Sequence, residues 1–308
     1  MAKIEIAIVG LGKIARDQHV PSIAAGDDFE LVAVASPHHS LDGVPSFNSI
    51  EALLRAVPGV EAVALCTTPQ VRFDIARYAL ERGKHVLLEK PPGVSVSEVR
   101  ALIDIAQRND AVLFASWHSR FAQAVEPARA WLTPRKISRI FITWKEDVRV
   151  WHPGQPWIWK AGGLGVFDPG INALSILTRL VPGTLALKTA TLFFPSNCET
   201  PIAAQLSLSD SDGVITQAEL DFLQTGPQTW NIDVDTDAGR LTLSMGGTIV
   251  TVDEKPLATV QAGEYSNLYA HFGRLVRERL SDVDYAPLQL VADAFLCGRR
   301  IEVEPFVE

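Results

Sequence analysis

The sequence predicts an α/β protein of two domains: a doubly wound parallel sheet, followed by an α+β domain on an open, mainly antiparallel sheet. Three observations favour this fold. Apolar runs of strand length alternate with helix-period segments up to about residue 120, a series of strand-like segments follows, and 308 residues exceed what one small domain needs. We place the domains at residues 1–120 and 121–308, with the C-terminal helix able to pack back on the first.

The first domain is expected to hold five parallel strands. The segments between the apolar runs are long enough for crossover helices, and strands that are apolar on both faces belong to a parallel sheet covered on both sides. Right-handed crossovers then give a doubly wound fold. The five runs are Ile4–Val9, Leu31–Ala35, Ala62–Cys66, His85–Leu88 and Val112–Ala115.

After Phe121 the pattern changes to a series of strands flanked by helices, and such a series is usually antiparallel. We expect helices over Gln123–Trp131, Pro169–Leu180, Tyr265–Leu280 and Pro287–Arg300. We expect strands over Ile137–Lys145, Lys188–Phe194, Ala203–Leu208, Val214–Phe222, Trp230–Val234, Arg240–Ser244 and Thr248–Val252.

Charge and cysteine content exclude several classes of function. The net charge is −8, and no cluster of Lys and Arg is present to bind a nucleic-acid backbone. Cys66, Cys198 and Cys297 are far apart, so neither a disulfide framework nor a metal site is expected. No apolar run reaches the roughly 18 residues that cross a membrane. Because the N-terminus reads as a strand and not as a signal peptide, we expect a cytoplasmic protein.

The turn after the first strand is expected to bind a dinucleotide. Gly10 permits a tight turn, Gly12 lets a pyrophosphate approach the backbone, and Ala15 lets the helix pack closely on the strand. Lys13 and Ile14 complete the turn, where the helix N-terminus favours an anion. A glycine pair alone is weak evidence, but here strand, turn and helix fall in the required order.

The segment after the second strand should contact the adenosine ribose. A carboxylate there would accept hydrogen bonds from a free 2′-hydroxyl and would repel a 2′-phosphate. The sequence has Ser36 and His38 instead, so we favour NADP somewhat over NAD, although no Arg is present. The alternative is that the histidines of this loop are simply solvated.

Two further strand ends lie at the same edge of the sheet. Thr67, Thr68 and Pro69 follow the third strand, and their backbone is expected to contact the cofactor. Glu89 and Lys90 end the fourth strand, where a lysine would point into the crevice. The positive charge of an oxidised nicotinamide would lower the pKa of Lys90 towards acid/base use, and Glu89 would hold its ammonium. The alternative for Lys90 is a surface lysine before a proline turn.

Together these motifs resemble the Gfo/Idh/MocA oxidoreductases. The resemblance rests on Gly10–Ala15, Gly83–Pro91 and Gly162–Asn172, and it covers nearly the whole chain. It implies an N-terminal Rossmann domain, a nicotinamide cofactor and hydride transfer without a metal. It also implies a C-terminal sheet that supports substrate binding and oligomerisation, so we expect a homodimer or homotetramer. In that family the lysine at Lys90 contacts the reacting hydroxyl, and we expect a cis Lys90–Pro91 bond.

A closer resemblance is to the bacterial galactose and arabinose 1-dehydrogenases of that family. It rests on Gly12–His19, Trp144–Arg149, Trp151–Gln155 and the segment around Asp168. It implies that Glu146 and His152 bind sugar hydroxyls, although loop charges of this kind are usually solvated. Many family members carry His four residues after the aspartate. Asn172 stands there instead, as in the aldose group, which moves acid/base work to Lys90 and Asp168.

Asp168 and Asn172 are four residues apart at the start of a helix, so both side chains lie on one face and can hold a ring hydroxyl between them. The alternative for Asp168 is a helix N-cap before a first-turn proline; the two roles are compatible.

Aromatic residues and one histidine complete the candidate site. Trp151 and Trp230 are candidates to stack on the apolar face of a sugar, although any single Trp is more often a core residue. His118 follows the fifth strand and is a candidate contact for the nicotinamide or a sugar hydroxyl, or else a satisfied interdomain histidine.

We therefore expect an aldose 1-dehydrogenase that oxidises an aldopyranose at C1 to the aldonolactone. Lys90 is the first candidate for the proton acceptor, and Asp168 is the next link or an alternative base. Two other functions stay open: an inositol-type dehydrogenase that oxidises a ring alcohol, and a noncatalytic sugar sensor that binds the cofactor.

Overall fold

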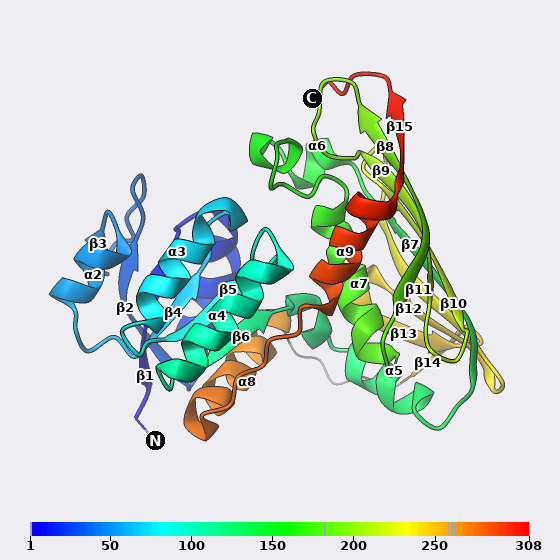
Figure 1. The fold of residues 1–308 in the computed structure, drawn as a ribbon. Coiled ribbons are helices and arrows are strands. Elements are labelled where there is room, and N and C mark those ends of the chain that lie inside the picture. Colours follow the sequence, from blue (N-terminus) through cyan, green and yellow to red (C-terminus); the bar gives the residue numbers. More distant parts are fainter. Residues whose placement is uncertain (1, 182, 258, 260–262, 308) are drawn as a thin grey trace. The chain divides into compact units, whose positions relative to one another are not determined.

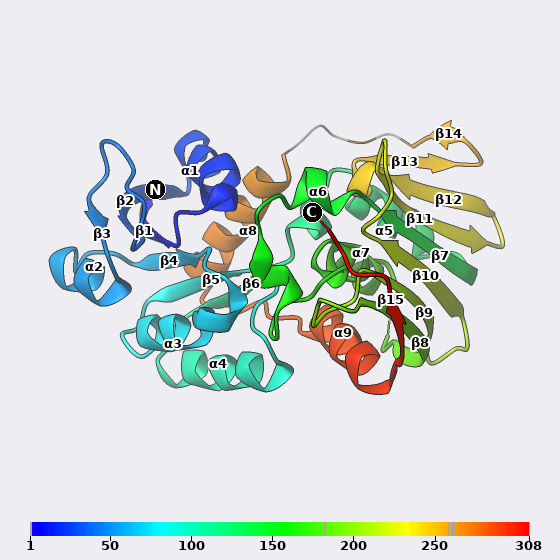
Figure 2. The same ribbon diagram turned by 90° about the horizontal axis from the view of Figure 1, so that it is seen from above.

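The computed structural model describes residues 2–181, 183–257, 259 and 263–307. They form two compact units. The first comprises residues 1–118 and 263–285, and the second comprises residues 119–262 and 286–308. In Figures 1 and 2 the first unit contains the blue and cyan elements together with helix α8, in orange.

The first unit is built on a six-stranded, wholly parallel sheet in the order β3-β2-β1-β4-β5-β6. All five predicted strands are confirmed within one or two residues at either end, and a short edge strand, β3, is added. The strands are β1 (Ile4–Val9), β2 (Phe29–Ala35), β3 (Ser46–Phe47), β4 (Ala62–Leu65), β5 (His85–Glu89) and β6 (Leu113–Ser116). Order and direction are those of a Rossmann fold.

Helices on this sheet bury one apolar face each. In α4 this face is Val99, Leu102 and Ile105, and the Ser95 hydroxyl caps its start by accepting the Glu98 N–H at 3.2 Å. The α-helices of the unit are α1 (Val20–Ala25), α2 (Ile50–Ala56), α3 (Pro69–Leu80), α4 (Val96–Arg108) and α8 (Glu264–Glu278), and a π-helical turn, Ala15–His19, precedes α1.

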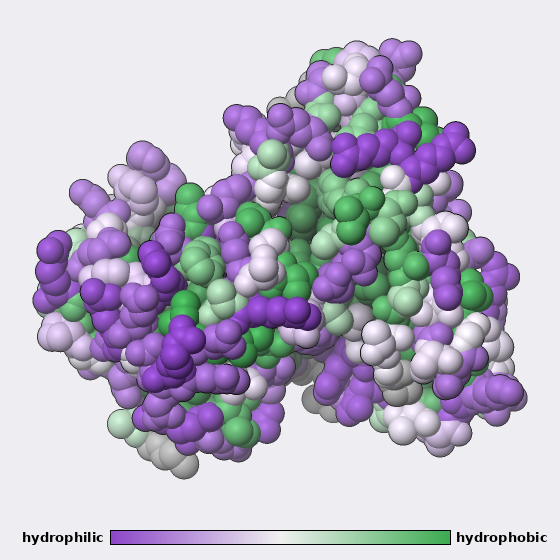
Figure 3. Space-filling model, viewed as in Figure 1, coloured by the Kyte–Doolittle hydropathy of each residue, from purple (hydrophilic) through white to green (hydrophobic). Residues whose placement is uncertain are grey.

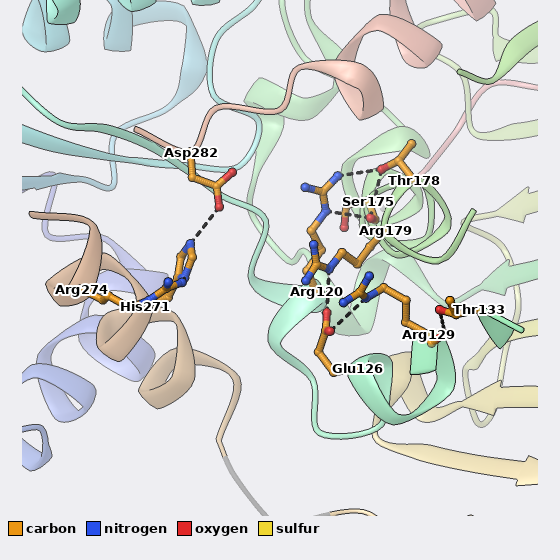
Figure 4. Close-up of polar contacts among 10 residues, drawn as sticks. All are labelled: Arg120, Glu126, Arg129, Thr133, Ser175, Thr178, Arg179, His271, Arg274 and Asp282. Carbon is orange, nitrogen blue, oxygen red and sulfur yellow. Dashed lines mark hydrogen bonds and ion pairs between the residues drawn. The ribbon is translucent and has the colours of Figure 1, made fainter. Parts of the chain in front are cut away.

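Helix α8 belongs to this unit although it comes after the strands of the second. The Phe272 ring stacks on Phe29 at 5.3 Å and on Phe114 at 5.8 Å. His271 contacts Asp282 at 2.8 Å, as Figure 4 shows, so the segment after the helix is held too.

The second unit is built on a nine-stranded sheet in the order β14-β13-β12-β11-β7-β10-β9-β8-β15. Six neighbouring pairs are antiparallel, whereas β7 pairs with β10 and β8 with β15 in parallel, so the mainly antiparallel prediction is confirmed. The strands are β7 (Ile137–Lys145), β8 (Ala186–Pro195), β9 (Ala203–Ser209), β10 (Ile215–Asp221), β11 (Thr229–Thr236), β12 (Gly239–Ser244), β13 (Ile249–Val252), β14 (Lys255–Pro256) and β15 (Arg299–Val303).

The prediction of a helix from Pro287 to Arg300 is wrong at its C-terminal end, where strand β15 begins. Helix α9 (Ala286–Cys297) ends before Gly298, and residues Arg299–Val303, in which polar and apolar side chains alternate from Arg300 on, pair with β8 instead. The other α-helices of the unit are α5 (Val125–Leu132), α6 (Val148–Trp151) and α7 (Phe167–Leu180).

Helix α7 carries Asp168 and is held firmly within its unit. Glu126 of α5 binds two arginines, Arg179 of α7 at 2.6 Å and Arg129 at 3.0 Å. Burial raises the pKa of Glu126, but its hydrogen bonds to the two arginines outweigh this and give a net lowering. Arg120 donates to the Ser175 carbonyl at 2.8 Å on the same helix (Figure 4). These contacts tie the middle and the C-terminal end of α7 to the segment before β7.

Hydrophilic side chains cover most of the face seen in Figure 3. Within the described part of the chain, no helix combines the length and the apolar character that a membrane span requires.

Candidate active site

The glycine turn after β1 has the geometry of a phosphate cradle. Gly10 has φ +91°, and a Cβ there would lie 2.7 Å from the Thr67 nitrogen, so only glycine fits. A Cβ at Gly12 would meet nothing within 4 Å, which leaves open space beside the backbone. Helical hydrogen bonding starts here, because the Arg16 N–H donates to the Gly12 carbonyl at 3.2 Å. An anionic pyrophosphate fits this open helix N-terminus.

Thr67 lies against this turn, and its side chain is a second indication of a ligand site. Its hydroxyl oxygen is buried and has no hydrogen-bond partner among the described residues. Such buried polar atoms are normally satisfied, so a ligand oxygen fits this place. Thr68 is the N-cap residue of α3 without a side-chain cap bond, and Pro69 begins the helix.

The loop after β2 contains the residues expected at the ribose. Ser36 is buried and donates its backbone N–H to the Phe47 carbonyl at 2.8 Å, whereas His38 is exposed. Arg16, which the sequence analysis missed, reaches this loop and donates to the Ser40 carbonyl at 3.1 Å. The exposed Lys13 side chain pairs with Asp17.

Lys90 follows β5, and its peptide bond to Pro91 is cis, as expected. Its backbone N–H donates to Oε2 of Glu89 at 2.8 Å. Glu89 is only 3% exposed, so it contacts the backbone of Lys90 from inside the unit.

Glu89 belongs to a buried network that includes His19. Its Oε1 accepts the Tyr265 hydroxyl at 2.7 Å and contacts Nε2 of His19 at 3.0 Å. Nδ1 of His19 lies 2.7 Å from the Tyr269 hydroxyl.

This network moves the pKa of both ionisable partners towards a charged pair. Burial raises the pKa of Glu89, but the hydrogen bond and charge of His19 overcome this and lower it to about 2. Burial disfavours a charged His19, yet interactions with Cys66, Tyr269 and Glu89 raise its pKa well above the ordinary value. Burial, together with the charge of Glu89, raises the pKa of Tyr265, which stays a donor.

Arg72 of α3 is a second residue that the sequence analysis missed. It is buried, and its guanidinium donates to the carbonyls of Glu89 and Pro91 on either side of Lys90. It also donates to the carbonyl of Thr67. One side chain therefore holds two of the strand ends that carry candidate site residues. Its place within an ordinary helical pattern gave no sign of this.

His118 is placed by α8. Its Nδ1 lies 2.8 Å from the Glu264 carboxylate, and its ring stacks on Tyr265 at 5.4 Å.

In the second unit, α7 places Asp168 and Asn172 one turn apart. The helix begins at Phe167 with Val166 as N-cap and no side-chain cap bond, so the alternative that Asp168 is the N-cap is wrong. The helix starts earlier than predicted because a proline is tolerated in the first turn, where its missing N–H has no intrahelical acceptor. Asp168 is buried, and Asn172 is half-buried.

Two carboxylates flank the imidazole of His152, which follows α6. Nε2 lies 3.1 Å from Oε1 of Glu146, and Nδ1 lies 3.6 Å from Oδ2 of Asp168. Glu146, only 1% exposed, also accepts the Trp230 indole N–H at 2.8 Å. Both oxygens of Glu146 therefore have protein partners, and His152 stands between Glu146 and Asp168.

An aromatic surface adjoins this group. The Trp151 ring, 41% exposed, lies 4.7 Å from the ring of Trp230. Trp230 stacks in turn on the buried Trp144 at 5.9 Å. Both predicted stacking residues thus belong to one cluster that also holds Glu146.

Each unit therefore gathers its own part of the predicted site. The first brings together the glycine turn, Thr67 and Lys90, and the second brings together Asp168, His152, Glu146 and Trp230. That Lys90 and Asp168 meet stays a prediction.

Comparison with known proteins identifies relatives over the full chain. A model described as an oxidoreductase family with an NAD-binding Rossmann fold matches residues 4–116. The chain is 45% identical to galactose 1-dehydrogenase of Pseudomonas fluorescens over 308 residues, all of both proteins.

Solved structures show the same fold. A crystal structure of a D-galactose-1-dehydrogenase protein from Rhizobium etli matches with a TM-score of 0.96 and 51% identity, covering 100% of this chain and 99% of that one. An inositol dehydrogenase homolog complexed with NAD⁺ from Azotobacter vinelandii matches with a TM-score of 0.80 and 19% identity, covering 96% and 94%.

Proposed function

Because the chain belongs to the Gfo/Idh/MocA oxidoreductases, we propose that it oxidises aldopyranoses of galactose or arabinose type at C1 to the aldonolactone. The observation that carries this proposal is the arrangement of Asp168, His152 and Glu146 beside Trp151 and Trp230. It offers acid/base groups next to an aromatic surface, which suits a sugar with polar hydroxyls and apolar C–H faces. The full-length similarity to a galactose 1-dehydrogenase supports the same substrate class.

A nicotinamide dinucleotide is the cofactor, and when bound it would supply the acceptor for the hydride that leaves C1. Gly10 and Gly12 would admit its pyrophosphate, Thr67 would donate its free hydroxyl, and the backbone of Thr68 and Pro69 would line the same edge. His118 would lie near the nicotinamide or a sugar hydroxyl.

We propose NADP as the preferred form. Ser36 and His38 lie in a loop without a carboxylate that would repel a 2′-phosphate. Arg16 supplies the guanidinium that this loop lacks in sequence, because its side chain reaches the carbonyl of Ser40.

Lys90 takes the proton of the anomeric hydroxyl, and Asp168 is the next acceptor or the alternative base. His152 would keep Asp168 in place, and Glu146 would hold the imidazole by its other nitrogen. Asn172 would donate to a ring hydroxyl, and Trp151 with Trp230 would cover the apolar face of the ring. The second sheet would form the contact of a homodimer or homotetramer.

The test is an assay of reduced nicotinamide with a panel of aldoses and with both cofactors. We expect galactose or arabinose to be oxidised, and Lys90→Ala to lower turnover by at least about a hundredfold, the scale of a general acid/base group. Cofactor binding without reduction of the cofactor by any aldose would overturn the proposal and favour a sensor. A stable ketone as product would favour an inositol-type reaction instead.

A further inference from the structure

We propose that His19 is a positioning residue for the reaction: through Glu89 it holds the backbone of Lys90, and it thereby joins Lys90 to the glycine turn. This inference rests on the proposed role of Lys90. It assigns a function to a buried histidine that the mechanism above does not use.

The first step of the argument is the way in which the Lys90 backbone is held. Oε2 of Glu89 accepts the Lys90 N–H at 2.8 Å. Arg72 binds the carbonyls of the residues on either side, Glu89 and Pro91. The peptide groups around Lys90 are therefore bonded to two buried charged side chains, and the carboxylate of Glu89 is the acceptor for the lysine's own N–H.

The second step is the place of His19 in the chain. It is the last residue of a π-helical turn, Ala15–His19, which begins three residues after Gly12, and its side chain is fully buried. Single π-helical turns are rare and are often found at functional sites. The same short segment thus carries the open glycine at one end and the partner of Glu89 at the other.

The third step is the set of groups that face the imidazole. Glu89 of β5 and Tyr269 of α8 bind its two nitrogens, and the ring of Tyr265 lies 5.0 Å away. Cys66, after β4, also interacts with it and favours its charged form. No second carboxylate is among these partners, so Glu89 is the anion that pairs with His19.

A purely structural ion pair is the competing explanation. Buried ion pairs are weak contributors to stability, since the cost of removing the charges from water offsets their attraction. A neutral pair of similar shape would serve a structural role as well. The second carboxylate oxygen of Glu89, however, accepts a hydrogen bond from the Lys90 N–H. Removal of the His19 charge leaves a buried carboxylate that must shift or take up a proton, and the Lys90 backbone moves with it.

The test compares His19→Gln with the matched variant His85→Gln. His85 is a buried histidine at the opposite end of β5, where its Nδ1 accepts the Val112 N–H at 3.0 Å. We expect His19→Gln to lower kcat at least about tenfold with little change in the KM for sugar, because a small misplacement of a reacting group is costly. His85→Gln should change stability without that loss.

The second measurement needs neither cofactor nor activity: hydrogen exchange of the Lys90 amide, followed by NMR. We expect His19→Gln to accelerate this exchange at least about tenfold relative to the wild type, since the acceptor of that N–H is displaced. His85→Gln should leave it unchanged. Equal exchange rates and equal kcat in the two variants would overturn the inference.

If His19→Gln does not fold, Tyr269→Phe removes only the hydroxyl that binds Nδ1 of His19. We then expect smaller changes in the same direction, and wild-type kcat with wild-type Lys90 exchange would overturn the inference. If the wild type oxidises no aldose, the proposed function fails, while the exchange comparison still decides whether His19 positions Lys90.

Discussion

Nδ1 of His152 lies 3.6 Å from a carboxylate oxygen of Asp168, while the other nitrogen of the same ring contacts Glu146. The family pattern would place an imidazole at position 172, where this chain has Asn172. Here an imidazole reaches Asp168 from a different segment, the one that follows α6. The aspartate therefore has a histidine partner although its own helix does not supply one.

The first prediction concerns Asp168. We expect Asp168→Asn to lower kcat/KM by at least about a hundredfold, because the amide cannot accept a proton. Steady-state kinetics with galactose measures this. Asp235 forms an exposed ion pair with Arg240 of the neighbouring strand. Asp235→Asn is therefore the control and should keep wild-type kinetics. Activity of Asp168→Asn within threefold of wild type would contradict a role in proton transfer.

The second prediction concerns Glu146. Glu146→Leu removes the carboxylate that accepts the Trp230 indole N–H at 2.8 Å in a buried place, so this donor loses its acceptor. Leaving a buried donor without an acceptor costs about 1–3 kcal/mol, so the free energy of unfolding should fall by that amount. Denaturant unfolding measures it.

The matched control for Glu146 is Glu219→Leu. Glu219 of β10 forms a partly exposed pair with Lys145, the last residue of β7, which directly precedes Glu146. Its loss should cost less than about 1 kcal/mol, as is usual for surface pairs. Equal losses of unfolding free energy in the two variants would contradict a larger contribution of the buried Glu146 contacts to stability.

The third prediction concerns the pH dependence of the His19–Glu89 pair. Glu89 has a lowered pKa, so its contribution to stability is present above its ordinary value of 4.5 and is lost as the pH falls towards about 2. His19 has a raised pKa, so its contribution is present below its ordinary value of 6.5 and is lost as the pH rises through the raised value. Both contributions are complete only between these two ordinary values.

The measurement for this pair is the unfolding free energy of the wild type relative to the doubly neutral variant with His19→Gln and Glu89→Gln. We expect this difference in unfolding free energy to change least between pH 4.5 and 6.5. Below and above that range the wild type should lose stability relative to the variant. A difference that does not depend on pH would contradict a charged pair.

The fourth prediction concerns Arg16 and the choice of cofactor. Arg16→Ala should raise the KM for NADP about three- to tenfold and leave that for NAD nearly unchanged, because only NADP carries the phosphate that a guanidinium binds. Arg77→Ala, another exposed arginine that pairs with Asp74 on α3, is the control. Parallel changes for both cofactors would contradict a contact with the 2′-phosphate.

Much of the fold followed from local patterns. The apolar runs of the first sheet and strand β7 were predicted closely, since a run buried on both faces, or a segment rich in β-branched and aromatic residues, is visible in sequence. Strand β15 was missed because a short final strand follows a helix with only Gly298 between them. The parallel pairing of β7 with β10 depends on contacts between distant segments, which no local pattern carries.

In the candidate site, too, some residues could be predicted from sequence motifs, whereas the roles of others depend on tertiary contacts. Gly10 and Lys90 stand in recognisable spacings, and the structure gives each the conformation that the motif requires. Arg72 and His19 were not assigned a role, because burial of a charged side chain depends on the partners that the fold brings to it. His152 was predicted as a sugar contact, whereas its pairing with both Glu146 and Asp168 is visible only in the folded unit.

The most direct test of the proposed reaction uses galactose that carries deuterium at C1. The products are analysed by mass spectrometry and NMR after turnover by the wild type with NADP⁺. Oxidation at C1 predicts that the deuterium appears in the reduced cofactor and that the sugar is recovered as the lactone or its acid. Deuterium that stays on the sugar while the cofactor is reduced would contradict the account.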